Sequence, residues 1–305
     1  MATLIGIDVG GTNLRVGVFS NLALIEETRF QANFSQFCKD HSPNEAWQKI
    51  LNVTANAIQT VIAKYPDVET IGIGFPGFID PSTQLIAQSP NLPGLINVNL
   101  AADLSQLIGK KVVVENDANA AAYGEYCLAG KPEGGLIYLG LGTGVGGGLI
   151  VDGKVYSGQH GCAMEVGHII IEPNGRQCGC GNHGCVEQYA SASGVAISYF
   201  NATQKQLSAY QIAELVGEGN KEAVAAYELA ANALAQVLAS ILKVVDVQTV
   251  IIGGGMAGAW NVIEKAFNTR LEADLIPVLR GKVHVQISKT GDAAGMLGAA
   301  MLTLG

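Results

Sequence analysis

The chain carries little charge and no excess of positive charge. Only 14% of its 305 residues are charged, and 18 Lys and Arg stand against 26 Asp and Glu, a net charge of −8. Because nucleic acids are bound through lysines and arginines on their phosphates, this balance disfavours a nucleic-acid partner. Apolar residues make up 49%, so most of the chain is expected to form packed elements, in one or two domains with a large core.

Targeting signals and the lysine of a P-loop are also missing. The first eight residues contain no basic region and no cleavage pattern, and no apolar run reaches membrane-spanning length without interruption. We therefore expect a cytoplasmic protein without a membrane partner. No Gly-Lys pair is followed by Ser or Thr, which excludes a P-loop, so any nucleotide must be bound in another way.

Cysteine is scarce, with six in the chain, yet half of them fall within eight positions: Cys178, Cys180 and Cys185. His168, ten residues before the first of them, could complete the Cys3His set of a structural zinc site. The Cys-x-Cys-x4-Cys spacing differs from the usual zinc knuckle, so a set of free thiols remains an alternative. Glu165 and Glu187 flank the cluster, and a site filled by four ligands leaves both carboxylates available for another task.

Glycine, by contrast, is abundant at 39 residues, and it marks a pattern that occurs twice. Strand, Gly/Thr turn and return strand are predicted at 4–9 and 15–19, and again about 130 residues later at 136–141 and 149–151, each followed by a third strand. We interpret this as two copies of one α/β unit that face each other across a cleft. Coincidence in a glycine-rich chain is the alternative.

Periodicity and breakers predict the remaining elements. Helices are expected at 43–65, 100–108, 118–128, 208–218, 221–245, 260–272 and 293–302. Further strands are expected at 22–28, 70–74, 111–115, 154–156, 248–252 and 283–287. The helix at 221–245 is so rich in alanine and leucine that we expect it to be almost wholly buried.

The two Gly/Thr turns are candidates for binding phosphate. Backbone N–H groups in such turns point outward and can cradle phosphate oxygens, although a single turn fits a plain hairpin equally well. Of three Gly-x-Gly-x-x-Gly matches, which start at Gly72, Gly142 and Gly253, only the third lies between a strand and a helix. Asp8 precedes the first turn and would repel phosphate unless Mg2+ lay between them; the alternative is that Asp8 caps its own turn.

Asn116 and Asp117 lie between a valine-rich strand and an alanine-rich helix. Either residue could be the helix N-cap, which is a frequent role of Asn and Asp. Only one cap is needed, and an aspartate at the carboxyl end of a strand is also well placed as a general base. The local sequence does not separate these two interpretations.

Six ordered motifs resemble the ROK family of sugar kinases and repressors over the whole chain, and most closely its bacterial glucokinase members. They are Asp8-x-Gly-Gly-Thr, Glu115-Asn-Asp-Ala-Asn-Ala, Gly142-Thr-Gly-x-Gly-Gly-Gly, Glu165-x-Gly-His, Cys178-x-Cys-Gly-x-x-Gly-Cys-x-Glu and Gly253-Gly-Gly. The resemblance implies an α/β, actin-like and ribonuclease-H-like (ASKHA) fold with duplicated βββαβα units. Its two lobes, 1–117 with 290–305 and 118–289, would close on ATP and sugar.

The resemblance also implies residue roles. Asp117 would be the base that takes the proton of the sugar 6-hydroxyl. The sugar would be surrounded by Gly77, Asn91, Asn116, Asp117, Glu165, His168 and Glu187. ATP and transient Mg2+ would be bound by Asp8, Gly10, Gly11, Thr12, Asn13, Gly142, Thr143, Gly144, Gly253, Gly254 and Gly255. A structural zinc on His168, Cys178, Cys180 and Cys185 would fix the loop that presents the sugar-binding residues.

The expected activity is ATP-dependent phosphorylation of a hexose at its 6-hydroxyl, with glucose first and hence a place in glycolysis. The short stretch between His168 and Cys178 resembles glucokinases and N-acetylmannosamine kinases, so the latter are the first alternative, with N-acetylglucosamine next. A sugar-responsive regulator is disfavoured because no helix-turn-helix precedes the first strand, and an NAD enzyme using the Gly253 turn is a further alternative. Asn13 replaces the family's usual lysine and Met164 its frequent glycine. Family resemblance suggests a homodimer or homotetramer.

Overall fold

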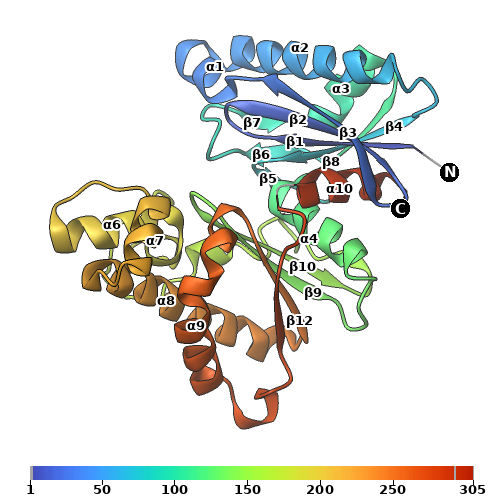
Figure 1. Cartoon of the computed structure of the whole chain (residues 1–305). Helices are drawn as coiled ribbons and strands as arrows, with labels where there is room; N and C mark the ends of the chain where they lie inside the picture. The colour runs from blue at the N-terminus through green and yellow to red at the C-terminus, as the bar shows by residue number, and fades with distance from the viewer. Residues whose placement is uncertain (1–2, 292, 305) are drawn as a thin grey trace. The chain divides into compact units, whose positions relative to one another are not determined.

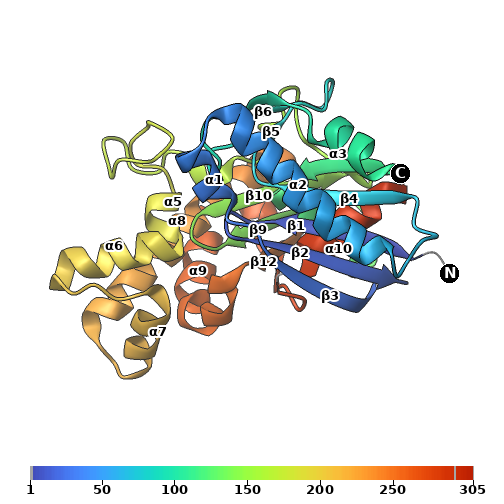
Figure 2. The same cartoon turned by 90° about the horizontal axis from the view of Figure 1, so that it is seen from above.

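A computed structural model describes residues 3–291 and 293–304 of the chain (Figures 1 and 2). The residues group into two compact units. Unit 1 consists of Met1–Glu133, Gly148–Ala163 and Asp292–Gly305, and unit 2 consists of Gly134–Gly147 and Met164–Gly291. Unit 1 therefore joins the N-terminal part of the chain to its C-terminal helix.

The sheet of unit 1 has the strand order β3-β2-β1-β4-β8. Its strands are β1 (Leu4–Val9), β2 (Asn13–Ser20), β3 (Ala23–Gln31), β4 (Thr70–Phe75) and β8 (Lys111–Asn116). β1, β2 and β3 pair antiparallel, whereas β4 and β8 run parallel to β1. In register, Gly74 lies between Asp8 on one side and Glu115 on the other, so the carboxyl ends of the three parallel strands meet at one edge of the sheet.

Helices cover both faces of this sheet, as Figure 1 shows with α2 above it and α10 below it. On one face, α2 (Pro43–Ile62) begins with a capping box and packs with α3 (Leu100–Ile108) into the hydrophobic core. On the other face, α10 (Ala293–Met301) crosses β1 and β4 so closely that a Cβ on Gly6 or Gly72 would overlap its backbone. Glycine is therefore required at both positions.

Several short elements of unit 1 were not predicted. α1 (Phe34–Asp40) follows β3, and a small sheet of order β5-β6-β7 is formed by Phe78–Ile79, Ile86–Gln88 and Ile96–Val98. Their segments are too short to give a period of their own, so the sequence carries no strong signal for them. α4 (Asp117–Leu128) connects this region to the second sheet and packs on α10.

The second sheet has the order β11-β10-β9-β12-β13. Its strands are β9 (Leu136–Leu141), β10 (Val145–Val151), β11 (Lys154–Val155), β12 (Thr249–Gly253) and β13 (His284–Ile287). As in the first sheet, the first strand in sequence is central, its two successors lie on one side, and two parallel strands lie on the other. This equivalence confirms the predicted duplication.

The helices of unit 2 are α5 (Glu187–Ala190), α6 (Ala192–Thr203), α7 (Ala209–Gly217), α8 (Lys221–Val245) and α9 (Trp260–Asp274). α8 is apolar and long enough to cross a membrane by length and composition alone, with a mean hydropathy of 1.5, but 56% of that window is buried inside the protein. It packs against α9 and α6 as a core helix. The prediction of nearly complete burial was too strong, because Leu229 is 40% exposed and Val244 83% exposed.

Candidate active site

The junction of β8 and α4 resolves the two interpretations of Asn116 and Asp117. The side-chain oxygen of Asn116 accepts a hydrogen bond from the backbone N–H of Asn119 at 3.0 Å, so Asn116 is the N-cap of α4. Its amide nitrogen donates to the backbone oxygen of Gly77 at 3.1 Å, which ties the loop after β4 to this junction. Asp117 is therefore the first residue of the helix and is not its cap.

The carboxylate of Asp117 accepts hydrogen bonds from its immediate neighbours. Oδ1 accepts one local hydrogen bond, from the backbone N–H of Ala118 at 2.9 Å. The residue is partly accessible, yet surrounding protein desolvates the carboxyl and raises its pKa above the ordinary aspartate value, against the lowering effect of nearby backbone N–H groups and of the Asn116 side chain. A carboxylate whose pKa is raised in this way is a better proton acceptor than a fully solvated one.

Glu115 is a further carboxylate at this junction to which the sequence assigned no role. Its Oε1 accepts hydrogen bonds from the backbone N–H of Asn116 at 2.9 Å and from the side chain of Asn119 at 3.1 Å. Burial raises its pKa. Since both donors belong to the first turn of α4 and its cap, Glu115 holds the strand–helix junction that presents Asp117. The only hint of this role in the sequence is that Glu115 begins the Glu-Asn-Asp-Ala-Asn motif.

The turn between β1 and β2 exposes the residues predicted to bind phosphate. The N–H of Gly10 donates to the backbone oxygen of Asn13 at 2.8 Å, and the side chains of Thr12 and Asn13 are exposed. Ser35 links this turn to Asn91, because its N–H donates to the Gly11 oxygen at 3.1 Å and its hydroxyl to the Asn91 oxygen at 3.1 Å. Unit 1 thus brings this turn together with Asn91, a residue that the family resemblance assigns to the sugar.

In unit 2, four of the predicted residues form a compact cluster. The ligand atoms of His168, Cys178, Cys180 and Cys185 all lie within 4.8 Å of one another. Two contacts are shorter: Sγ of Cys178 lies 3.7 Å from Nδ1 of His168, and the sulfurs of Cys180 and Cys185 are 3.6 Å apart. Thiolates on one tetrahedral zinc, with Zn–S bonds of ~2.3 Å, would be about 3.8 Å apart, so the donor set fits a structural zinc in type and spacing.

His168 presents its two ring nitrogens to different groups. Nδ1 faces the thiol cluster, whereas Nε2 lies 3.8 Å from Oε2 of Glu165. The residue before this glutamate, Met164, has a φ of +65°, in the left-handed region that favours glycine. A glycine would adopt this backbone conformation without strain, whereas this chain has methionine there. The side chains of Glu165 and His168 thus lie close together after this turn.

Glu187 lies against the second glycine turn. Its Oε2 accepts a hydrogen bond from the backbone N–H of Val145 at 3.1 Å, and the N–H of Ala192 donates to the Gly142 oxygen at 3.0 Å. A Cβ on Gly144 would overlap the Glu187 carboxylate, so a larger residue there would displace this side chain. The first residue of α5 and the turn predicted to bind phosphate are thus joined directly.

The Gly253 turn lies beside the Gly142 turn in unit 2. β12 and β9 are parallel, with Gly253 opposite Gly140, so both turns leave the same edge of the sheet. Gly254 has a φ of +82°, and a Cβ there would overlap the Leu141 backbone. The predicted direct passage into a helix is modified by a 3-10 segment, Gly255–Ala259, before α9 begins at Trp260.

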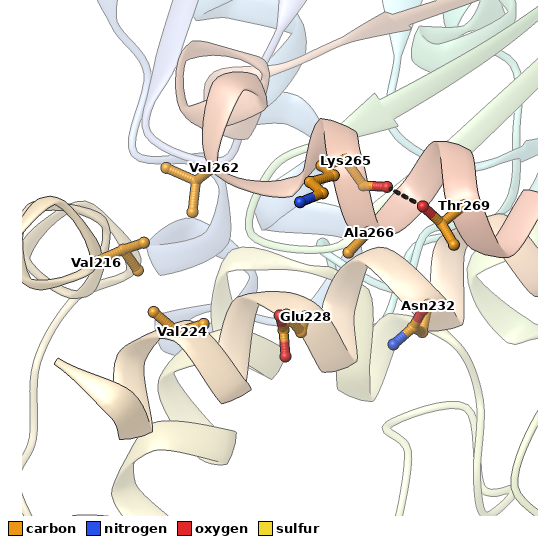
Figure 3. A pocket seen from close by; sticks show the side chains of 8 residues that line it. All are labelled: Val216, Val224, Glu228, Asn232, Val262, Lys265, Ala266 and Thr269. Carbon is orange, nitrogen blue, oxygen red and sulfur yellow. Dashed lines mark hydrogen bonds between the residues drawn. The ribbon is translucent and has the colours of Figure 1, made fainter. Parts of the chain in front are cut away.

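A groove of about 420 Å³ lies elsewhere in unit 2, between α8 and α9 near the end of α7 (Figure 3). It is lined by Val216, Val224, Glu228, Asn232, Val262, Lys265, Ala266 and Thr269. None of the residues predicted to bind sugar, nucleotide or metal lines it. The hydrogen bond drawn in Figure 3, from Thr269 to the Lys265 backbone at 2.8 Å, belongs to α9 itself.

Comparison with known proteins identifies the family. The ROK family profile matches residues 4–305. The chain belongs to the ROK family. It is 30% identical to a glucokinase from Thermotoga maritima over 314 residues, covering 98% of this chain and 96% of the relative. It is 33% identical to an N-acetyl-D-glucosamine kinase from Shigella boydii over 311 residues, covering 98% of each.

A solved ROK structure is similar over the full length. The ROK family glucokinase from Streptomyces griseus, in complex with glucose and AMPPNP, is 30% identical, with a TM-score of 0.80 and 100% of each chain covered. The predicted actin-like ASKHA fold is thereby confirmed. These kinases support sugar kinase activity and ATP use for this ROK protein.

Proposed function

We propose that this ROK protein transfers the γ-phosphoryl group of ATP to the 6-hydroxyl of a hexose, with glucose as the first candidate. The observation that carries this proposal is that Asn116, and not Asp117, is the N-cap of α4. Because Asn116 caps α4, the Asp117 carboxylate can accept a proton. The glucokinase relative and the glucokinase structure with glucose and AMPPNP support the choice of sugar and donor.

In this mechanism, Asp117 accepts the proton of the attacking hydroxyl and orients its oxygen towards the phosphorus. Phosphoryl transfer has a loose transition state, so positioning and neutralisation of charge supply most of the catalysis. We assign the other sugar hydroxyls to Glu165, His168 and Glu187, together with Gly77, Asn91 and Asn116. His168 would turn Nε2 to the sugar, because Nδ1 faces the thiols.

For ATP, we assign the phosphates to the backbone N–H groups of the turns at 10–13 and 142–144, and the nucleoside end to the turn at 253–255. Exposed Thr12 and Thr143 add hydroxyl donors. Mg2+, when bound, would neutralise charge on the phosphates, and Asp8 is the residue that we assign to hold it through water. A structural zinc would be held by His168, Cys178, Cys180 and Cys185, and it would order the loop without entering the reaction.

N-acetylglucosamine is the second candidate substrate. The N-acetyl-D-glucosamine kinase of Shigella boydii is slightly more identical to this chain, at 33%, than the Thermotoga glucokinase, at 30%. An N-acetylmannosamine kinase stays a further alternative on the length of the loop between His168 and Cys178. We also propose a cytoplasmic location, a homodimer or homotetramer, and no nucleic-acid or membrane partner.

The deciding experiment is an ADP-release assay with Mg-ATP and a panel of glucose, mannose, fructose, N-acetylglucosamine and N-acetylmannosamine. A preference in kcat/KM for glucose supports the proposal. A preference for an N-acetylated sugar would keep the role of Asp117 and replace the substrate. No turnover on any of these sugars would contradict the kinase proposal and favour a sugar-responsive regulator.

A further inference from the structure

Arg176 is a half-buried arginine in the loop between His168 and Cys178, and its guanidinium donates only to neutral acceptors among the described residues. Nη1 donates to the backbone oxygen of Gln188 at 2.6 Å and to that of Gly194 at 3.2 Å, and Nη2 donates to the hydroxyl of Ser198 at 2.9 Å. These acceptors belong to α5 and α6. The arginine therefore connects the loop of the thiol cluster to the helices that follow it.

A second set of contacts joins Arg176 to Tyr189. The guanidinium carbon lies 4.5 Å from the centre of the Tyr189 ring, within the range of a cation–π interaction. The backbone N–H of Arg176 donates to the Tyr189 hydroxyl at 3.0 Å. A Cβ on the preceding residue, Gly175, would overlap that hydroxyl. The side chain and the backbone of Arg176 thus both contact Tyr189.

These contacts fall on a helix that cannot be stable alone. α5 has four residues, Glu187–Ala190, and such a short helix depends on tertiary contacts. Its last carbonyls lack intrahelical donors, and Arg176 supplies one to Gln188. Because Gln188 and Tyr189 directly follow Glu187, fixing them fixes the backbone from which the Glu187 carboxylate reaches the Val145 N–H.

We propose that Arg176 is a positioning residue that sets the place of Glu187, both for the sugar and for the glycine turn at 142–148. This inference rests on the proposed function for its sugar part. The side-chain acceptors of Arg176 lie in α5 and α6, beyond the last cysteine, so the proposed route to Glu187 runs through these helices. A lysine at this position has one point of attachment and cannot reproduce the fork of donors or the stacking on Tyr189.

The test compares Arg176→Lys with Arg280→Lys. Arg280 is a matched control because it also donates to a backbone oxygen in unit 2, that of Leu275 at 3.1 Å, and has no assigned role. We expect Arg176→Lys to raise KM for glucose on the order of tenfold to a hundredfold, as for small misplacements of a binding group. kcat should change little, because Glu187 binds a hydroxyl that does not react. Arg280→Lys should leave both unchanged.

Two measurements without turnover complete the test. Hydrogen exchange of the Val145 amide should be faster in Arg176→Lys than in the wild type, and zinc content should be equal in both. Unchanged exchange and unchanged KM would overturn the inference, as would a loss of zinc in step with the rise in KM.

If Arg176→Lys does not fold, Tyr189→Phe serves as the second variant, because it removes only the hydroxyl acceptor. It should shift the Val145 exchange rate and KM in the same direction, and no shift would refute the proposal. A wild type without turnover would refute the proposed function, while the exchange result still decides the role of Arg176.

Discussion

The side-chain oxygen of Asn116 accepts a hydrogen bond from the backbone N–H of Asn119 and so caps the N-terminus of α4. The neighbouring Asp117 therefore needs no structural role at the helix end. Two residues that are equivalent cap candidates in the sequence are thereby distinguished: one is the cap and the other is a carboxylate that does not cap the helix. The consequences of this difference can be measured.

Asp117→Asn should reduce kcat by about 100-fold to 10,000-fold, the usual contribution of a general base. Sugar binding, measured by calorimetry with glucose, should largely survive because the amide keeps the size and an acceptor oxygen. Asp152→Asn is the matched control, since Asp152 lies in the β10–β11 turn with a φ of +51°, which asparagine also adopts. Near-normal turnover in Asp117→Asn would remove this residue from the mechanism.

The raised pKa of Asp117 also predicts a pH dependence of stability. Between the ordinary aspartate pKa of ~3.9 and the raised pKa in the fold, the folded state binds more protons than the unfolded state. The free energy of unfolding of the wild type should therefore fall as pH rises through this window, and Asp117→Asn should lack this contribution. Urea unfolding of both proteins from about pH 4 to pH 7 measures the difference. Glu115 titrates in both proteins and cancels in the comparison. If the two curves of unfolding free energy against pH were parallel, Asp117 would make no such contribution.

Metal analysis of protein purified without added metal should find about one zinc per chain, as expected for a single four-ligand site. Cys180→Ser should lose the metal and lower both Tm and glucose affinity. Cys162→Ser, which changes an exposed cysteine outside the cluster, should do neither. A fully stable zinc-free protein with unchanged glucose affinity would contradict a structural metal.

Met164→Gly should stabilise the protein by roughly 0.5–1 kcal/mol. The left-handed backbone costs a non-glycine residue about 1–2 kcal/mol, and the greater freedom of glycine in the unfolded chain offsets about 0.5–1 kcal/mol. Gln204→Gly is a matched comparison, because Gln204 ends α6 with a φ of +60°. Urea unfolding should show a gain for both, and a loss for Met164→Gly alone would mean that the methionine side chain contributes packing that the backbone argument omits.

Much of the fold could be predicted where elements are long and periodic. The bounds of β1, α3, β9 and α8 agree with the predicted ranges, because their apolar patterns and breakers coincide. α5 and α6 were missed. The four residues of α5 give no period, and the helix is held by Arg176, eleven residues before it begins. α6, Ala192–Thr203, was missed although it has 12 residues. The predicted lobes, 1–117 with 290–305 and 118–289, stay a prediction.

The site was predictable to the extent that its chemistry is local. The thiol cluster and the glycine turns stand together in the sequence, and the structure confirms that the four metal-binding candidates meet. The Glu187–Val145 hydrogen bond and the contact of Ser35 with Asn91 join distant segments, so the sequence does not show them. The capping of α4 is local, but the sequence offers two adjacent residues that could each be the cap. The sugar-binding and nucleotide-binding roles stay predictions.

The close approach of α10 to Gly6 and Gly72 has a consequence for how the protein is made. α10 packs directly on β1, and Gly6 and Met296, which meet there, are 290 positions apart in the sequence. During synthesis on the ribosome, β1 and β4 emerge early, but the glycine face of their sheet has no partner until α10 has left the exit tunnel. The nascent chain must keep this face from other contacts until α10 is available. Unit 1 can therefore complete its folding only at the end of synthesis, although its first strand is made first.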